Sequence, residues 1–211
     1  MTYIVTTEYD IDRVAAPNLP LAPAEWNRQY QDQFANVLRL YFNRLDNFIA
    51  RLDATAVPYG AFSSDQDQTA VANTATLMTF NTTDFANGVT IANSKITVAT
   101  AGIYNLQFSA QFVNTDTAFQ DVYIWLKQKG VDITGSTGFV SVPNRHAGTD
   151  GHTIVGWNYF LSMAASDYVE IYWSVPNTAV SIQHIPASGT PTKPSTQSVV
   201  ATLSFVSALA T

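Results

Sequence analysis

Apolar residues recur at helical spacing in one long stretch of the chain, residues 26–52. From Phe34 onward they are separated by four, three, four, three and four residues, which is the a/d spacing of a coiled coil. This stripe comprises Phe34, Leu38, Tyr41, Leu45, Phe48 and Leu52. Val37, Phe42 and Ile49 widen the apolar face, which suits three strands better than two. We expect a trimeric stalk over residues 23–54, with an amphipathic helix on the core of its own domain as the alternative.

The stretch before the helix, residues 1–22, has a different pattern. Prolines at positions 17, 20 and 23 favour an extended path, and so short a segment cannot bury a core of its own. We expect an arm that becomes ordered against a partner, with a disordered tail as the alternative. Pro23 is expected in the first helical turn, with Glu25 close behind it. The expected docking residues are Tyr3, Ile4, Val5, Tyr9, Pro17, Leu19 and Pro20.

From residue 57 the period of the pattern changes to two, as in half-buried strands. Val122, Ile124 and Leu126 alternate with Tyr123, Trp125 and Lys127. Short β-rich runs separated by turn residues predict an antiparallel sandwich or jelly roll. The expected strands are residues 59–63, 75–81, 89–91, 95–98, 103–113, 120–128, 137–142, 153–162, 168–175, 179–185 and 199–206.

Composition narrows the possible functions. Charged residues make up only 12% of the chain, and the net charge is −6, so nucleic acid is not an expected partner because phosphate binding needs clustered cations. Cysteine is absent, which excludes disulfides and thiolate metal sites. No apolar run approaches the ~18–20 residues of a membrane span, and the first residues lack the pattern of a signal peptide. We expect no membrane insertion.

Six segments of the body, in order, resemble a known family. They are Phe62-Ser-Ser, Leu77-Met-Thr-Phe-Asn, the run from Lys95 to Ser109 with Gly102-Ile-Tyr, the run from Val122 to Ile133, and Asp167-Tyr-Val-Glu-Ile followed by Ala201-Thr-Leu-Ser-Phe. Together they resemble the C1q/TNF-like jelly roll found in structural proteins of tailed phages. The closing strand lacks the Phe-x-Gly usual in that family. The resemblance implies a mostly β protein, with a jelly-roll head over residues 57–211 behind the arm and the helix.

Residues 18–26 and 36–46 are also similar to the N-terminal segment of short virion proteins from phages of aquatic bacteria. These resemblances imply a homotrimer located in the virion and assembled in the host cytoplasm. We expect the arm and helix to bind other virion proteins of the tail or baseplate, and the head to bind a host surface glycan or protein. A capsid decoration protein that stabilises the shell is the alternative.

The sequence offers little support for catalysis. His146, His152 and His184 have no visible partners at ligand or triad spacing, and no nucleophile elbow or phosphate loop occurs. Paired carboxylates of a glycan-degrading enzyme remain an alternative, and Asp65 with Asp67 a weak candidate for calcium. We expect no enzyme activity and no cofactor.

Receptor contacts are expected on loops, where side chains are free to bind. The candidate loops are residues 114–120, 143–152 and 186–198, and the candidate residues are Phe119, Asn144, Arg145 and His146. Aromatic rings stack on sugars while polar groups supply hydrogen bonds. Because they lie in strands, Trp125, Trp157 and Trp173 are instead expected in the core or at a subunit interface.

Overall fold

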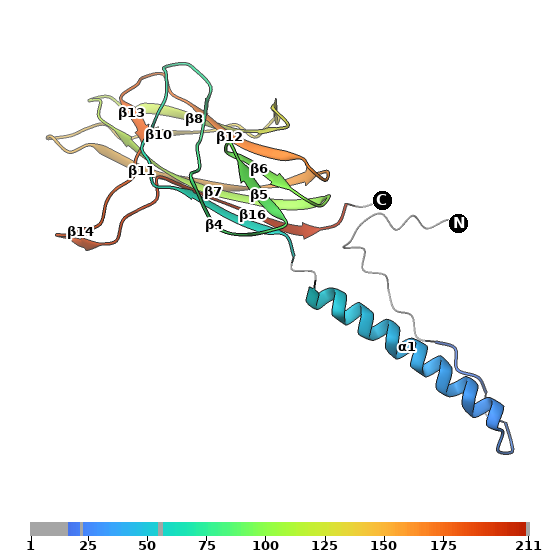
Figure 1. Cartoon of the computed structure of the whole chain (residues 1–211). Coiled ribbons are helices and arrows are strands. Elements are labelled where there is room, and N and C mark those ends of the chain that lie inside the picture. The colour runs from blue at the N-terminus through green and yellow to red at the C-terminus, as the bar shows by residue number, and fades with distance from the viewer. Residues whose placement is uncertain (1–16, 22, 55–56, 210–211) are drawn as a thin grey trace. The chain divides into compact units, whose positions relative to one another are not determined.

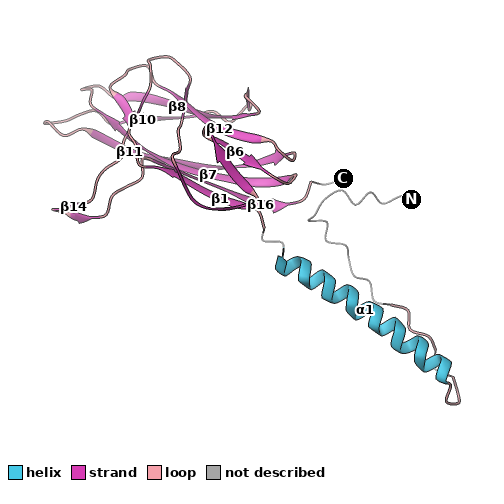
Figure 2. Ribbon diagram, viewed as in Figure 1, coloured by secondary structure: helices cyan, strands magenta, loops and turns pink. Residues whose placement is uncertain are grey.

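The computed structural model describes residues 17–21, 23–54 and 57–209. It divides into two units, Met1–Ala56 and Val57–Thr211, which are treated separately. The first contains the helix α1 and the second contains the strands (Figures 1 and 2). The expected architecture is therefore confirmed at the level of an antiparallel β-sandwich preceded by one helix.

The helix α1 spans Arg28–Ala54. It begins later than the proline and acid at positions 23 and 25 had indicated, because Asn27 caps it. The Tyr30 backbone N–H donates to Asn27 Oδ1 at 3.1 Å, which satisfies one of the amides that the first turn leaves unpaired. Pro23 and Glu25 therefore precede the helix.

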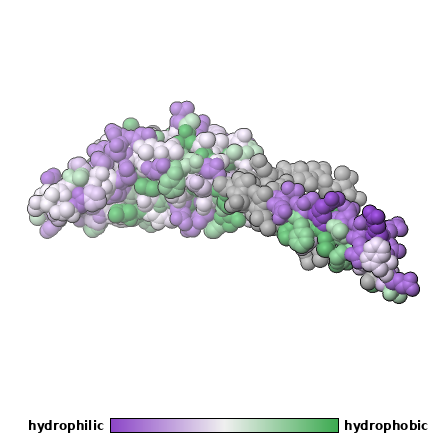
Figure 3. Space-filling model, turned by 60° about the horizontal axis from the view of Figure 1, so that its bottom comes forward, coloured by the Kyte–Doolittle hydropathy of each residue, from purple (hydrophilic) through white to green (hydrophobic). Residues whose placement is uncertain are grey.

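The predicted stripe is formed on one side of α1. Phe34, Leu38, Tyr41 and Leu45 are half-buried, while the side chains of Phe48 and Leu52 lie outside the described part. The ring centres of Tyr30 and Phe34 are 6.0 Å apart and the two rings are stacked. Tyr30 therefore extends the apolar face by one turn. Leu40 and Phe42 are each more than half exposed. Figure 3 shows apolar surface on the part of the chain that forms the helix.

Two seven-stranded sheets form the sandwich. Sheet A contains β1 (Tyr59–Ser64), β2 (Gln68–Thr69), β4 (Thr82–Asn87), β7 (Gly102–Asn114), β11 (Gly151–Met163), β13 (Val180–Ile182) and β16 (Val199–Ser207). Sheet B contains β3 (Thr76–Leu77), β5 (Val89–Ala92), β6 (Lys95–Val98), β8 (Gln120–Gln128), β9 (Val131–Asp132), β10 (Gly138–Val142) and β12 (Tyr168–Ser174). A small hairpin of β14 (Ser188–Gly189) and β15 (Thr192–Lys193) stands apart from both.

Eight of these strands pair as a nested set. Strand β1 pairs with β16, β6 with β12, β7 with β11, and β8 with β10, all antiparallel. Pairing of β16 with β7 and of β12 with β8 then joins the four pairs into two sheets. The first strand of the chain thus lies beside the last. In the sequence, both strands of each later pair fall between the two strands of the pair before it.

The core lies between the sheets and follows the predicted alternation. Tyr104, Leu106, Ile124, Leu126 and Trp173 are fully buried. Burial of each such Leu or Ile side chain contributes about 1.5–3 kcal/mol relative to exposure. Because alternate residues fill this core, the others on each strand must lie on the two outer faces of the sandwich.

The strand prediction was wrong in part. The predicted strand 179–185 is reduced to Val180–Ile182, and two further differences have a clear physical cause. Of residues 75–81, only Thr76–Leu77 form a strand. The Gln68 side chain bonds the backbone of Thr79 on both sides, with Thr79 N–H donating to Oε1 and Nε2 donating to the Thr79 carbonyl. Strand β4 was not expected, because all six of its residues are exposed and show no alternation. It forms by pairing with β1 along its whole length.

Candidate binding surfaces

Three loops meet at the end of the sandwich opposite the end where the chain enters β1 (Figure 1). Asp116, in the β7–β8 loop, holds them together. Its carboxylate accepts hydrogen bonds from Asn177 at 2.7 Å and Gln120 at 2.8 Å. Its backbone carbonyl accepts the Arg145 N–H. The expected 114–120 and 143–152 loops therefore meet, together with residues 175–179, which the sequence analysis had not singled out.

The predicted receptor residues differ in their surroundings. Phe119 is 66% exposed. Arg145 forms an ion pair with Asp150, with Nε 3.2 Å from Oδ1. His146 and Thr149 exchange backbone hydrogen bonds of 2.9 Å across a tight turn in which Ala147 and Gly148 both have positive φ. The turn leaves the His146 side chain exposed, whereas Asn144 is half-buried.

The third predicted receptor loop, residues 186–198, carries the β14–β15 hairpin. Its base is closed by the bridge between Ile185 and Thr196. Lys193 Nζ donates to the Pro186 carbonyl at 2.6 Å, which ties the strand back onto the start of the loop. The segment is thus an ordered projection instead of an open loop.

The outer face of sheet A is almost free of charge. Of its seven strands, only β4 contains an Asp, Glu, Lys or Arg, namely Asp84. Polar positions on β7 and β11 are amides and hydroxyls, such as Asn105, Gln107 and Asn158. Between them lie Ile154, 72% exposed, and Phe160, 61% exposed. Figure 3, turned so that the bottom of the view in Figure 1 comes forward, shows green apolar patches among purple and pale surface. Solvated sheet faces ordinarily carry charges, so this face resembles one that another protein covers.

The outer face of sheet B has a different chemistry. Its strands carry five charged residues and a row of aromatic side chains. Trp125 stacks with Tyr172, with 5.9 Å between the ring centres, and the ring centres of Tyr123 and Phe139 are 6.0 Å apart. The strand tryptophans were expected in the core or at a subunit interface. Trp173 is fully buried and Trp157 packs against the core, whereas Trp125 lies on this outer face, outside the core.

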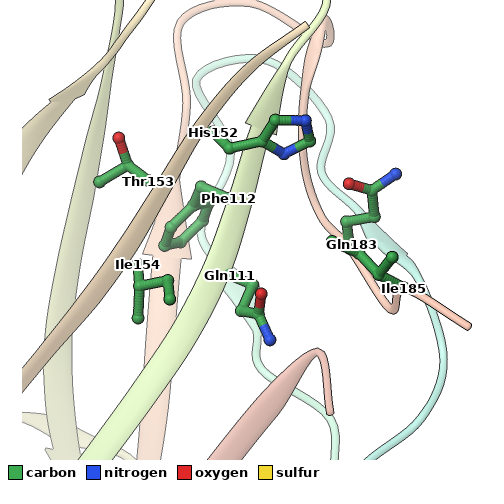
Figure 4. A pocket seen from close by; sticks show the side chains of 7 residues that line it. All are labelled: Gln111, Phe112, His152, Thr153, Ile154, Gln183 and Ile185. Atoms are coloured by element: carbon green, nitrogen blue, oxygen red, sulfur yellow. The ribbon is translucent and has the colours of Figure 1, made fainter. Parts of the chain in front are cut away.

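One pocket of about 280 Å³ lies near the end of β7 (Figure 4). It is lined by Gln111, Phe112, His152, Thr153, Ile154, Gln183 and Ile185. His152 is the one titratable side chain of this lining, beside amides, the Thr153 hydroxyl and apolar groups. Covalent catalysis would need a nucleophile in contact with a base, and consecutive strand residues such as His152 and Thr153 point to opposite faces.

Carboxylates elsewhere are occupied by local contacts. Asp67 Oδ1 accepts the His184 N–H at 2.7 Å, and Asp65 Oδ1 accepts from Asn81 at 2.6 Å. Among the described residues, no three His, Asp or Glu side chains gather as a metal would require. Likewise, within the described residues no helix is long and apolar enough to cross a membrane.

Asp167 has the most specific carboxylate environment of the sandwich. Burial alone would raise its pKa, but the Ala164 N–H, the Lys129 ammonium at 3.1 Å and the Gln128 amide at 3.0 Å outweigh that effect. Together they hold the pKa of Asp167 below its ordinary value. Asp167 closes the turn between β11 and β12 and has a structural role.

The expected docking residues Tyr3, Ile4, Val5 and Tyr9 lie outside the described residues. Pro17, Leu19 and Pro20 are described, and Leu19 is 46% exposed.

No protein-family model matches the chain, and no curated protein matches it in sequence.

Proposed function

We propose that the chain is a structural protein of a tailed-phage virion that forms a homotrimeric short fibre. In this proposal the N-terminal arm and helix anchor it to other virion proteins, and the sandwich binds the host surface. The protein acts by binding and has no catalytic role. The virion setting rests on the sequence resemblance described above.

The strand pairing supports a jelly roll of the C1q/TNF-like type. A jelly roll arises when a long antiparallel hairpin wraps around a core, so that strands pair from the outside inwards. The nested pairs β1–β16, β6–β12, β7–β11 and β8–β10 follow that rule.

The observation that carries the trimer is the nearly charge-free outer face of sheet A. Exposed Ile154 and Phe160, set among neutral amides, gain from burial against another subunit. A second subunit surface over β7 and β11, which contain no Asp, Glu, Lys or Arg, would not bury an unpaired ion from these groups. Burying such an ion is the main cost of covering an ordinary surface. The apolar stripe of α1 supplies a second self-association surface of helical type.

Two measurements test the proposal. Sedimentation equilibrium of the full chain should give three times the 23.0 kDa of one chain, and a monomer at micromolar concentration would refute the trimer. Gold-labelled antibody should then mark the tail or baseplate of virions. Label confined to the capsid shell would favour the decoration alternative, which shares the same architecture.

A further inference from the structure

We propose that the outer face of sheet B is a binding platform for an uncharged saccharide. The platform consists of Tyr123, Trp125, Phe139, Tyr168 and Tyr172, with the polar residues between them. The inference names the ligand class of the host-surface binding in the proposed function and rests on that function for its setting.

The aromatic residues come from three adjacent strands and share one face. Register places Phe139 of β10 opposite Tyr123 of β8, and Trp125 of β8 opposite Tyr172 of β12. Tyr123 is 41% exposed and Phe139 is 69% exposed. Tyr123 and Trp125 are two residues apart on β8, so the two ring pairs lie next to each other on one face and form an aromatic strip across the strands. Aromatic rings attract the weakly positive C–H groups of a pyranose ring because their faces carry negative charge density.

Polar contacts fix this strip in place. The Trp125 indole N–H donates to Asp132 Oδ1 at 2.7 Å, so the ring cannot turn freely. Lys127 Nζ lies 4.5 Å from the centre of the Tyr172 ring and 3.4 Å from Asp132. A prearranged surface loses less conformational entropy when a ligand binds.

The charges on the platform balance one another, which points to a neutral ligand. Lys127 is paired with Asp132, and Glu170 lies directly opposite Lys127 on the neighbouring strand. Lys95 lies over the Tyr168 ring at 4.5 Å. The Asp121 carboxylate accepts a hydrogen bond from Ser141. No cluster of cations remains to attract a phosphate or an acidic polysaccharide, whereas hydroxyl groups of a sugar can bond to both carboxylates and ammonium groups.

The contrast with sheet A argues against a protein as the occupant. The outward positions of β8, β10 and β12 contain no aliphatic side chain, and they include charged Asp121 and Lys127 together with Glu170, which is only 5% exposed. The cores of protein interfaces are depleted of charge. Sheet A, with Ile154 and Phe160 among neutral amides, has the chemistry of a protein interface. A trimer that covers sheet A leaves sheet B facing outward, free to bind a glycan.

Titration of the full-length protein with a panel of uncharged hexasaccharides of glucose, galactose, mannose, xylose and N-acetylglucosamine tests the inference. Tryptophan fluorescence and calorimetry give the readout. At least one member should bind, and Phe139→Ala and Tyr123→Ala should each weaken that binding about tenfold, as for aromatic residues at the centre of a binding surface. Both side chains are exposed, so these variants should keep the thermal midpoint of the wild type. Trp125→Ala should abolish the fluorescence response.

Phe85→Ala is the matched control, since it removes an aromatic ring that is 62% exposed from β4, at the edge of the other sheet. It should leave sugar binding unchanged. Failure of every neutral hexasaccharide to bind would overturn the inference, as would binding of polygalacturonate alone. So would binding that is lost in Phe119→Ala but kept in Phe139→Ala and Tyr123→Ala, which would place the ligand on the loops. None of these results affects the trimer or the virion location, which sedimentation and antibody labelling measure separately.

Discussion

At the scale of single residues, Asp167 links local chemistry to the stability of the sandwich. Its carboxylate is bonded by the Ala164 N–H, Gln128 and Lys129. Asp167→Asn keeps the shape but removes the charge, so we expect the free energy of unfolding at pH 7 to fall by about 1–3 kcal/mol. Urea titration followed by circular dichroism measures this change.

The pH dependence of the same variant follows from the lowered pKa. A carboxyl whose folded pKa lies below its unfolded value of 3.8 stabilises the protein above that value. The contribution is lost as the pH falls through the folded pKa. The difference between wild type and Asp167→Asn should therefore be constant from pH 7 to about 5 and shrink below about pH 4. An equal difference at pH 7 and pH 3 would contradict this account.

Asp116 is a second residue whose importance depends on its position in the fold. Asp116→Ala removes the acceptor for Asn177 and Gln120, so residues 115–119, 143–150 and 175–179 should lose order together. Hydrogen exchange in these loops should rise, with a stability loss of about 1–2 kcal/mol. Thr117→Ala, in the same loop but exposed, is the control and should change neither quantity.

The sequence alone could indicate only part of this residue-scale picture. The alternation in β8 already placed Trp125 on the face opposite Val122, Ile124 and Leu126, yet the residue type led to the expectation of a core or interface position. Position in the strand was the better guide. By contrast, the hydrogen bond between Asp116 and Asn177 joins residues far apart in the chain, so no local sequence pattern predicts it.

At the scale of elements, the patterns that succeeded are those that burial enforces. The bounds of β6 and β8 match the prediction because one side of each strand faces the core. Strand β4 has no buried side and is held by backbone pairing with β1, so its sequence carries no period. The predicted start of the helix was too early. Pro23 indicated a first turn at that position, but the helix begins after Asn27, whose side-chain oxygen accepts a hydrogen bond from the Tyr30 N–H.

The stripe of α1 is the element with the clearest test. In a coiled coil, Leu38→Asp places three carboxylates at one seam position, where burial and repulsion both disfavour them. We expect the protein concentration at which half of the chains are in trimers to rise about tenfold or more above that of the wild type, measured by sedimentation equilibrium. Asn43→Asp adds the same charge on the opposite side of the helix and should leave association unchanged. Equal effects of the two variants would mean that the stripe does not mediate trimer formation.

At the scale of the whole molecule, the proposed trimer has two separate contact surfaces on one chain, the stripe of α1 and the outer face of sheet A. When one of them is associated, the other is held at a high effective concentration and needs little affinity of its own. Weakening either surface alone should therefore lower the association constant without abolishing the trimer.

The combined variant distinguishes this arrangement from a trimer built on one surface. Ile154→Asp with Phe160→Asp puts like charges on the sheet A face, and these should repel across a covered interface. Either that pair or Leu38→Asp should leave a trimer detectable at high protein concentration, while all three together should give a monomer of 23.0 kDa. Val131→Asp, at an exposed site on β9 of sheet B, should not alter the mass in any background. If the sheet A pair alone had no effect on the mass at any concentration, the stalk would be sufficient and sheet A would not be the subunit interface.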